Sequence, residues 1–192
     1  MTLRIETLRG DALAPHLDAL ARLRIAVFRD WPYLYDGDMD YERQYLAAYR
    51  PPGAVVVGAF DGAEMVGAAT AAPMERHAED FAAAFAGEDL GAIYYLAESV
   101  LLPAFRGQGL GHRFFDAREA EARALGRRRA AFCSVIRPGD HPARPEGARS
   151  HDAFWRGRGY APVPGAVAHF SWRDIGDEAP TEKPLQFWAR EL

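Results

Sequence analysis

The feature that most constrains the fold is a long apolar run followed by a glycine-rich turn and an amphipathic helix. The run covers residues 93–102 and Pro103 closes it, while glycines punctuate residues 106–111. Apolar residues then recur on one face of a predicted helix over 109–125, and a second apolar run covers 130–135. Strand, turn, helix and strand in this order predict a βαβ unit whose first strand is covered on both faces.

Other apolar patterns predict the remaining elements. Strands are expected at 3–8, 54–60, 65–70, 167–172 and 185–188, and helices at 11–28, 41–49, 75–85 and 152–156. The dipeptide Asp61-Gly62 has the turn chemistry of a tight hairpin between two of these strands. On the helix at 11–28, Arg24 is expected to face water. Residues 33–38 form a turn-rich loop with aromatic and acidic side chains that can reach a ligand.

Size and charge restrict the class of protein. A chain of 192 residues suits one globular domain over 1–192, and 49% hydrophobic with 26% charged residues is a soluble globular composition. A net charge of −4 argues against a general nucleic-acid binder, which needs a basic stripe to displace counterions from phosphates. Lys183 is the only lysine among many arginines, which suggests a GC-rich bacterial genome.

The single cysteine and the lack of long apolar segments bear on compartment. Cys133 excludes an intramolecular disulfide, and its apolar surroundings predict a buried strand thiol with no metal-ligating partner cysteine. Charged residues interrupt positions 1–25, so no signal peptide is expected there, and no apolar window reaches membrane-spanning length. We therefore expect a cytoplasmic protein without a membrane or metal partner.

The turn Arg106-Gly107-Gln108-Gly109-Leu110-Gly111 is the clearest candidate for ligand binding. Free backbone N–H groups and the helix dipole attract phosphate oxygens at such a helix start, and glycines allow close approach. A purely structural turn would use glycine for the same conformational freedom. The Lys-Ser/Thr ending of a P-loop is missing and the spacing differs from dinucleotide sites, which leaves a pyrophosphate turn of another kind.

This turn, after a strand that ends at Pro103, resembles the signature of the GNAT acyltransferase superfamily: Arg or Gln, two residues, Gly, one residue, then Gly or Ala. The order of elements resembles the family over nearly the whole chain, although the helix expected at 75–85 lies outside the usual pattern. The resemblance implies an α/β (α+β) fold with a mixed, mostly antiparallel sheet flanked by helices. It also implies transfer of an acyl group, most commonly acetyl from acetyl-CoA, to an amine.

The resemblance assigns roles to individual positions. Amides of the turn, from Arg106 and Gly107 through Gln108, Gly109, Leu110 and Gly111, would hold the coenzyme A pyrophosphate, while Val100, Leu101 and Leu102 would pair with the pantetheine arm. Glu98 would be the general base that deprotonates the amine, with a structural carboxylate paired to an arginine as the alternative.

The general acid is not at its usual place. Many relatives carry a tyrosine where this chain has Trp155, and indole cannot give up its proton at neutral pH. Tyr160, a tyrosine of the 33–35 loop, or water would have to substitute.

Residues expected to bind the acceptor lie in loops and on the motif strand: Tyr33, Tyr35, Asp36, Ser99, Arg137 and His141. Asp36 can attract a cationic amine or form an ordinary turn, and Arg137 and His141 can recognise substrate or simply tie down their loop. The expected partner is a small-molecule amine, and a homodimer is compatible with the family. Two other readings remain: a non-catalytic acyl-CoA-binding or regulatory module, and a phosphate-binding domain unrelated to coenzyme A.

Overall fold

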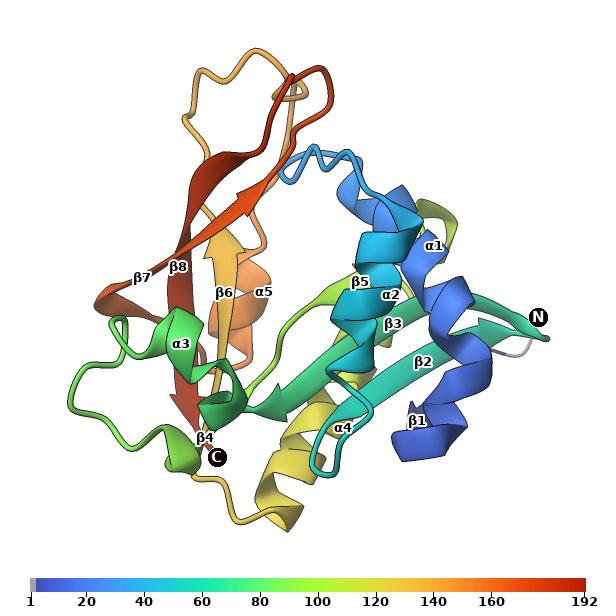
Figure 1. Ribbon diagram of the computed structural model, residues 1–192, viewed down its shortest axis with the longest axis vertical. Coiled ribbons are helices and arrows are strands. Elements are labelled where there is room, and N and C mark those ends of the chain that lie inside the picture. Colours follow the sequence, from blue (N-terminus) through green and yellow to red (C-terminus); the bar gives the residue numbers. More distant parts are fainter. Residues whose placement is uncertain (1–2) are drawn as a thin grey trace.

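The computed structural model describes residues 3–192 and contains an 8-stranded sheet (Figure 1). The strands are β1 Leu3–Leu8, β2 Val55–Asp61, β3 Glu64–Pro73, β4 Ile93–Tyr95, β5 Ser99–Leu101, β6 Arg129–Val135, β7 Ala161–Trp172 and β8 Thr181–Glu191. The α-helices are α1 Leu17–Phe28, α2 Met39–Ala47, α3 Ala78–Phe81, α4 Leu110–Ala124 and α5 Asp152–Gly157. Short 3-10 helices cover η1 Gly10–His16, η2 Met74–His77, η3 Leu90–Ala92 and η4 Pro103–Phe105.

The sheet is mixed and mostly antiparallel. Its order is β1-β2-β3-β4-β6-β8-β7, with β5 paired to β3 beside β4. Of the strand pairs within residues 3–192, β4 with β6 is parallel and the others are antiparallel. The fold class expected from the sequence is therefore confirmed.

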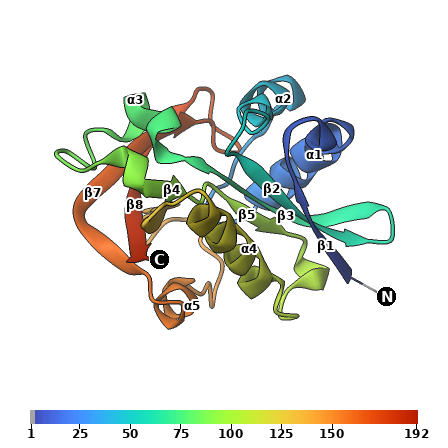
Figure 2. The ribbon, with the colours of Figure 1, turned by 90° about the horizontal axis from the view of Figure 1, so that it is seen from below.

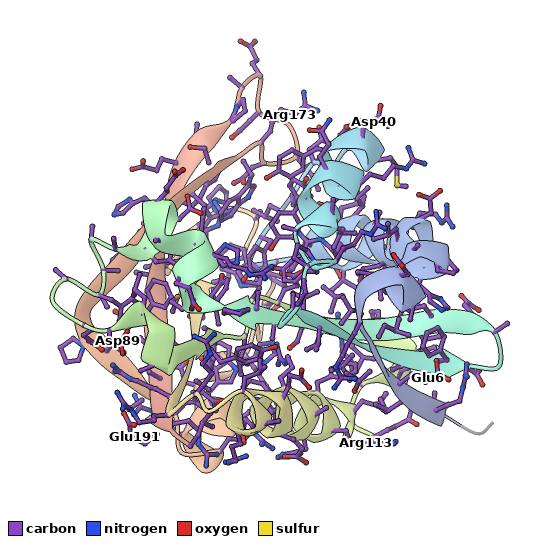
Figure 3. All side chains as sticks on the ribbon, turned by 60° about the horizontal axis from the view of Figure 1, so that its bottom comes forward. Glu6, Asp40, Asp89, Arg113, Arg173 and Glu191 are labelled. Carbon is purple, nitrogen blue, oxygen red and sulfur yellow. The ribbon has the colours of Figure 1, made fainter. Side chains whose placement is uncertain are left out.

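Helices cover both faces of this sheet. Figure 2 shows α1, α2 and α3 on one side and α4 and α5 on the other. The labelled Asp40 on α2 and Arg113 on α4 accordingly lie on opposite sides of the sheet (Figure 3). None of the helices within residues 3–192 has both the length and the apolar character needed to cross a membrane.

Local sequence signals place most elements correctly. The hairpin between β2 and β3 turns at Asp61-Gly62, where Gly62 has φ +61° and Asp61 faces Glu64. The α2 helix begins after Asp38, whose carboxylate accepts bonds from the amides of Asp40 and Tyr41 at 3.0 and 2.9 Å.

Three predictions were wrong in detail. The helix expected at 11–28 is a 3-10 turn followed by α1, because Pro15 has no N–H to continue an α-helix. The helix expected at 75–85 shortens to η2 and α3, and Phe81 of α3 and Phe85 of the following turn are buried against the sheet. Arg24, expected to face water, is 7% exposed because it pairs with buried carboxylates.

The strand expected over 93–102 is interrupted, and this interruption opens the sheet. The last backbone hydrogen bond between this 93–102 stretch and β6 is donated by the Leu96 amide to the Ala131 carbonyl, at 2.8 Å. The chain then stays with β3 alone, through the Ala97 and Glu98 backbone bonds to Thr70 at 3.1 and 3.0 Å. Because β6 continues along β8, β5 and β6 diverge beyond this point.

Candidate functional site

The glycine turn leaves a row of backbone donors free. Gly107 and Gly109 have φ of +76° and +77°, conformations that L side chains rarely adopt. Across residues 3–192, no carbonyl or side chain accepts a bond from the amides of 107–112, and the first amide of this region to be satisfied is Arg113, bonded to the Gly109 carbonyl at 3.3 Å. Free amides at the start of a 15-residue helix suit an anionic group such as a pyrophosphate.

An exposed arginine and the helix α5 lie beside the turn. Arg106 is exposed and its Nε donates to the Leu101 carbonyl at 3.2 Å, which ties the turn to the end of β5. A Cβ added at Gly111 would lie 3.4 Å from the Phe154 ring of α5. The start of α4 therefore lies close to α5, beside the free amides.

A buried arginine of α4 stabilises the interruption between β4 and β5. Nη1 of Arg118 donates to the carbonyls of Thr70 and Glu98 at 3.2 and 3.1 Å, and Nη2 donates to Ser99 Oγ at 2.8 Å. Burial lowers the pKa of Arg118 to about 10, so the guanidinium stays charged at neutral pH. Ser99, expected to bind substrate, is thus bonded to this arginine.

A cavity of ≈ 190 Å³ lies where β5 and β6 diverge. Ala97 and Glu98 from the motif strand and Cys133 from β6 contribute to its lining. From α1, α2 and the loop between them come the aromatic residues Phe28, Tyr33, Tyr35, Tyr41 and Tyr45. From α3 and the sheet come Phe81, Tyr95, Phe170 and Trp172. The cavity is therefore an aromatic pocket on the α1–α2 face.

Glu98 is the carboxylate at the centre of a buried charge network. Its Oε1 pairs with Nη1 of Arg24, and its Oε2 accepts the Tyr45 hydroxyl at 2.9 Å. Nε of Arg24 also donates to Glu42 at 2.5 Å. Burial by itself would lower the pKa of Arg24, but Glu98, Tyr45 and Glu42 outweigh it and raise that pKa well above its usual value. One oxygen of Glu98 is thus in an ion pair and the other accepts a hydrogen bond.

The hydroxyl and thiol groups of the cavity are neutral at physiological pH. Burial raises the pKa of Tyr33, Tyr35, Tyr45 and Tyr95 well above the usual value for tyrosine. Burial also raises the pKa of Cys133 to about 12, and its Sγ lies 3.4 Å from the Tyr95 hydroxyl. The expectation of a buried thiol on a strand is confirmed.

The cavity also contains a histidine that sequence reasoning missed. His77 ends η2, and its ring centroid lies 5.1 Å from that of Tyr95 and 5.5 Å from that of Phe81. Burial lowers the pKa of His77 below its ordinary value of 6.5, although Asp80 and Glu98 oppose this. The ring is therefore neutral at pH 7.

The structure separates the residues expected to bind substrate. Tyr33 and Tyr35 line the cavity. Asp36 instead pairs with Arg173 at 2.5 Å. Of these three residues, Tyr33 and Tyr35 therefore lie at the cavity and Asp36 does not line it.

Two other expected residues stabilise loops. Arg137 pairs with Asp174 at 2.7 Å and donates to the Pro32 and Tyr33 carbonyls, each at 2.8 Å. Its guanidinium therefore fixes the loop that carries Tyr33. His141 accepts the Ala143 amide at 3.1 Å within its own loop and does not line the cavity. The structural reading fits both side chains.

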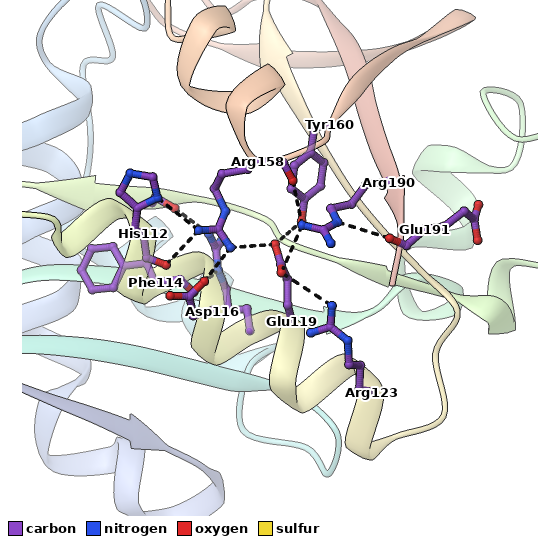
Figure 4. Close-up of polar contacts among 11 residues, drawn as sticks. His112, Phe114, Asp116, Glu119, Arg123, Arg158, Tyr160, Arg190 and Glu191 are labelled. Atoms are coloured by element: carbon purple, nitrogen blue, oxygen red, sulfur yellow. Dashed lines mark hydrogen bonds and ion pairs between the residues drawn. The ribbon is translucent and has the colours of Figure 1, made fainter.

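Tyr160, offered as the acid, lies in a different part of the molecule. Its hydroxyl donates to Glu119 at 3.0 Å, within a cluster that includes Arg158 and Arg190 (Figure 4). Burial raises its pKa far above the ordinary value. Tyr160 does not line the cavity that contains Glu98, so its hydroxyl is not positioned to act as the acid there.

Trp155 does not take over that role. Its ring packs 5.0 Å from Phe132 and 5.1 Å from Trp188, centroid to centroid, and joins the core under α5. The residues that sequence reasoning missed are Arg24, Glu42, Tyr45 and His77. The pairing of α1 with α2 that brings the first three together has no local sequence signal.

Comparisons with known proteins show the family and the fold of the chain. A sequence profile described as the acetyltransferase (GNAT) family matches residues 20–145. No curated protein matches the chain in sequence. Among solved structures, the ribosomal-protein-alanine N-acetyltransferase of Brucella melitensis is 16% identical, with 100% of each chain covered and a TM-score of 0.63.

Two further structures are similar over their length. A Salmonella typhimurium protein described as an acetyltransferase, solved with its cofactor acetyl-CoA, is 15% identical, with 100% of this chain and 95% of that chain covered and a TM-score of 0.60. The polyamine N-acetyltransferase of Drosophila melanogaster, which forms N-acetylagmatine, is 14% identical, with 98% and 100% covered and a TM-score of 0.59. At these identities the likeness concerns the fold.

Proposed function

Because the chain belongs to the acetyltransferase (GNAT) family, we propose that it transfers an acetyl group from acetyl-CoA to the amino group of a small molecule. The observation that carries this proposal is the continuity of the site. Free amides at 107–112 lie at one end of β5, and the cavity that contains Glu98 lies at the other. A donor bound at the turn would thus reach an acceptor bound in the cavity.

The residues present fit coenzyme A. Free amides from Gly107 onward and the dipole of α4 suit its pyrophosphate, and Arg106 adds a cation next to them. Val100 and Leu101 of β5 and the adjacent Leu102 lie on the side that diverges from β6, so outward-facing backbone groups of this stretch would pair with an extended arm, although the Leu102 amide already donates to the Val66 carbonyl of β3 at 3.0 Å. When bound, acetyl-CoA supplies a thioester whose acyl carbon an amine can attack.

The cavity favours a compact amine that carries a ring. A dry cavity of about 150 Å³ takes one benzene, so ≈ 190 Å³ has room for a ring and a short chain. Aromatic faces attract an ammonium group, and the carboxylate of Glu98 can accept its N–H. Arg24 is the arginine in the lining, and Glu42 and Glu98 already engage it. An acceptor carboxylate would find no free cation among these described residues.

The test is a matched pair of acceptors with acetyl-CoA, followed by release of free thiol. We expect 2-phenylethylamine to be acetylated and phenylalanine, which adds only a carboxylate, to have a kcat/KM on the order of 100-fold lower, since leaving a charged group unpaired costs roughly 3 kcal/mol. Agmatine, a flexible dication, serves as a third acceptor. Equal rates with phenylalanine would contradict the proposed acceptor class.

Glu98→Gln separates binding from turnover. We expect this variant to bind acetyl-CoA as the wild type does and to lose most of its turnover, because an amide cannot hold the acceptor ammonium as a carboxylate does.

Trp155, in place of the expected tyrosine, favours a second candidate function, a non-catalytic acyl-CoA-binding module. Tight binding of acetyl-CoA with no turnover across the three acceptors and simple aliphatic amines would support that function instead.

A further inference from the structure

The segment between β3 and β4 brings a titratable side chain to the cavity. This segment includes η2 and α3 and lies outside the pattern expected for the family. His77 stands at the junction of η2 and α3 and lines the same cavity as Glu98. Among residues 3–192, no protein group forms a hydrogen bond with its ring nitrogens. They are free to meet a ligand.

Several charged groups face His77. Asp80 on α3 and Arg76 on η2 act from its own segment, and Glu98 acts from the break between β4 and β5. The rings of Phe81 and Tyr95 pack against the imidazole and limit its contact with water. Arg24 and Tyr45 also line the cavity, each bound to Glu98. Burial wins over the two acids, so the ring stays neutral at pH 7.

The other titratable groups of the cavity are less suited to accept a proton. The hydroxyls of the buried tyrosines and the Cys133 thiol keep their own protons at neutral pH. Glu98 is already held by an ion pair between its Oε1 and Arg24 and by the Tyr45 hydroxyl, which donates to its Oε2. Asp80 is exposed. An unpartnered neutral imidazole is the usual general base near pH 7.

Resting on the proposed function, we propose that His77 is the catalytic residue that takes a proton from the acceptor ammonium while Glu98 holds the same nitrogen. The neutral amine then forms the nitrogen–carbon bond of the product as the carbon–sulfur bond of the thioester breaks, and the electron pair leaves on sulfur. The second proton lost by nitrogen ends on the thiol. His77 returns its proton to water, so one proton is released per turnover.

The first test compares His77→Gln with His16→Gln, using acetyl-CoA and 2-phenylethylamine or whichever tested amine the wild type turns over fastest. His16 also packs edge-on against an aromatic ring, that of Phe60 at 5.2 Å, but does not line the cavity. We expect kcat/KM to fall about 100-fold in His77→Gln, with unchanged acetyl-CoA affinity, and to stay at the wild-type value in His16→Gln.

The pH profile is a readout that a packing role would not move. In the wild type, kcat/KM should decline on the acid side through an apparent pKa below 6.5, where His77 becomes protonated. That limb should disappear in His77→Gln, and imidazole in the buffer should restore part of the activity of His77→Ala. An unchanged limb and a rate within about twofold of wild type would overturn the inference while leaving the proposed function intact.

A binding experiment tests His77 without turnover, and does not require the variant to be active. In protein labelled at histidine, the His77 imidazole signal should titrate below pH 6.5. Addition of 2-phenylethylamine should shift the His77 signal and leave the His16 signal unchanged. A His77 signal that does not respond to the amine would refute the proposal. A wild-type chain that acetylates no amine would instead refute the proposed function, and the inference with it.

Discussion

Replacing Arg24 by methionine tests the charge network that holds Glu98. The Arg24 side chain is 8% exposed, and its partners Glu42 and Glu98 are 0% and 8% exposed. Methionine would leave both carboxylates buried without that cation. Removing one member of a buried charge group costs roughly 3–5 kcal/mol, and each kcal/mol lowers Tm by about 2–4 °C in a chain of this size. We therefore expect Tm to fall by roughly 6–20 °C.

Thermal unfolding followed by circular dichroism measures this loss, with Arg43→Met as the matched control. Arg43 also pairs with two carboxylates, Asp18 and Asp40, but at the surface, so its loss should barely change Tm. Acid protonates a stranded buried carboxylate, and the deficit of Arg24→Met should therefore shrink from pH 8 to pH 5.

A triple variant separates network breakage from the loss of one side chain. Arg24→Met combined with Glu42→Gln and Glu98→Gln removes every charge of the network and should regain much of the lost Tm, because no buried charge is left unpaired. If the Tm of Arg24→Met lay within about 2 °C of the wild-type Tm, the reasoning that the network stabilises the fold would be refuted.

Three further predictions concern single residues. Cys133 should react with iodoacetamide at pH 8 far more slowly in the native than in the unfolded protein, measured by mass spectrometry, because its pKa of about 12 keeps it a thiol. Arg118→Met should lower both Tm and kcat, since the Thr70 and Glu98 carbonyls each lose one of two donors and Ser99 Oγ loses its partner, and an unchanged kcat would deny that Arg118 positions the site. Burial alone would raise the pKa of Asp174, but Arg137 and Lys183 hold it below 3.8; its contribution to stability is present above that value and lost as pH falls through the lower folded pKa. Asp174→Asn should therefore flatten the loss of stability in acid, measured by urea unfolding at pH 2.5 to 6.

Features that depend on a few neighbouring residues could be predicted from the sequence. The Asp61-Gly62 hairpin, the glycine turn and the start of α4 each follow from the backbone preferences of glycine and the apolar spacing beside it. Cys133 was correctly expected to be buried, because most residues of the stretch 130–135 around it are apolar.

Features that depend on distant side chains could not be predicted from the sequence. The interruption after Leu96 is held by Arg118, which lies on α4, beyond both β5 and η4. The burial of Arg24 requires Glu42 from another helix, and an arginine on an amphipathic helix otherwise favours water. His77 sits in a segment whose alanine-rich sequence predicts only a helix. No local signal places its ring in the cavity that Glu98 lines.

Calorimetric titration of acetyl-CoA into wild type, Gly109→Val and Gly62→Val tests the central claim most directly. Both glycines have positive φ, +77° and +61°, and a Cβ at either would meet nothing within 4 Å, so the two variants carry the same kind of backbone strain at the turn and at a distant hairpin. The account predicts micromolar-range binding to wild type and Gly62→Val and a loss of at least about tenfold in Gly109→Val, where strain of roughly 1–3 kcal/mol disturbs the free amides. Absence of binding to the wild type, or equal affinity in all three proteins, would contradict it.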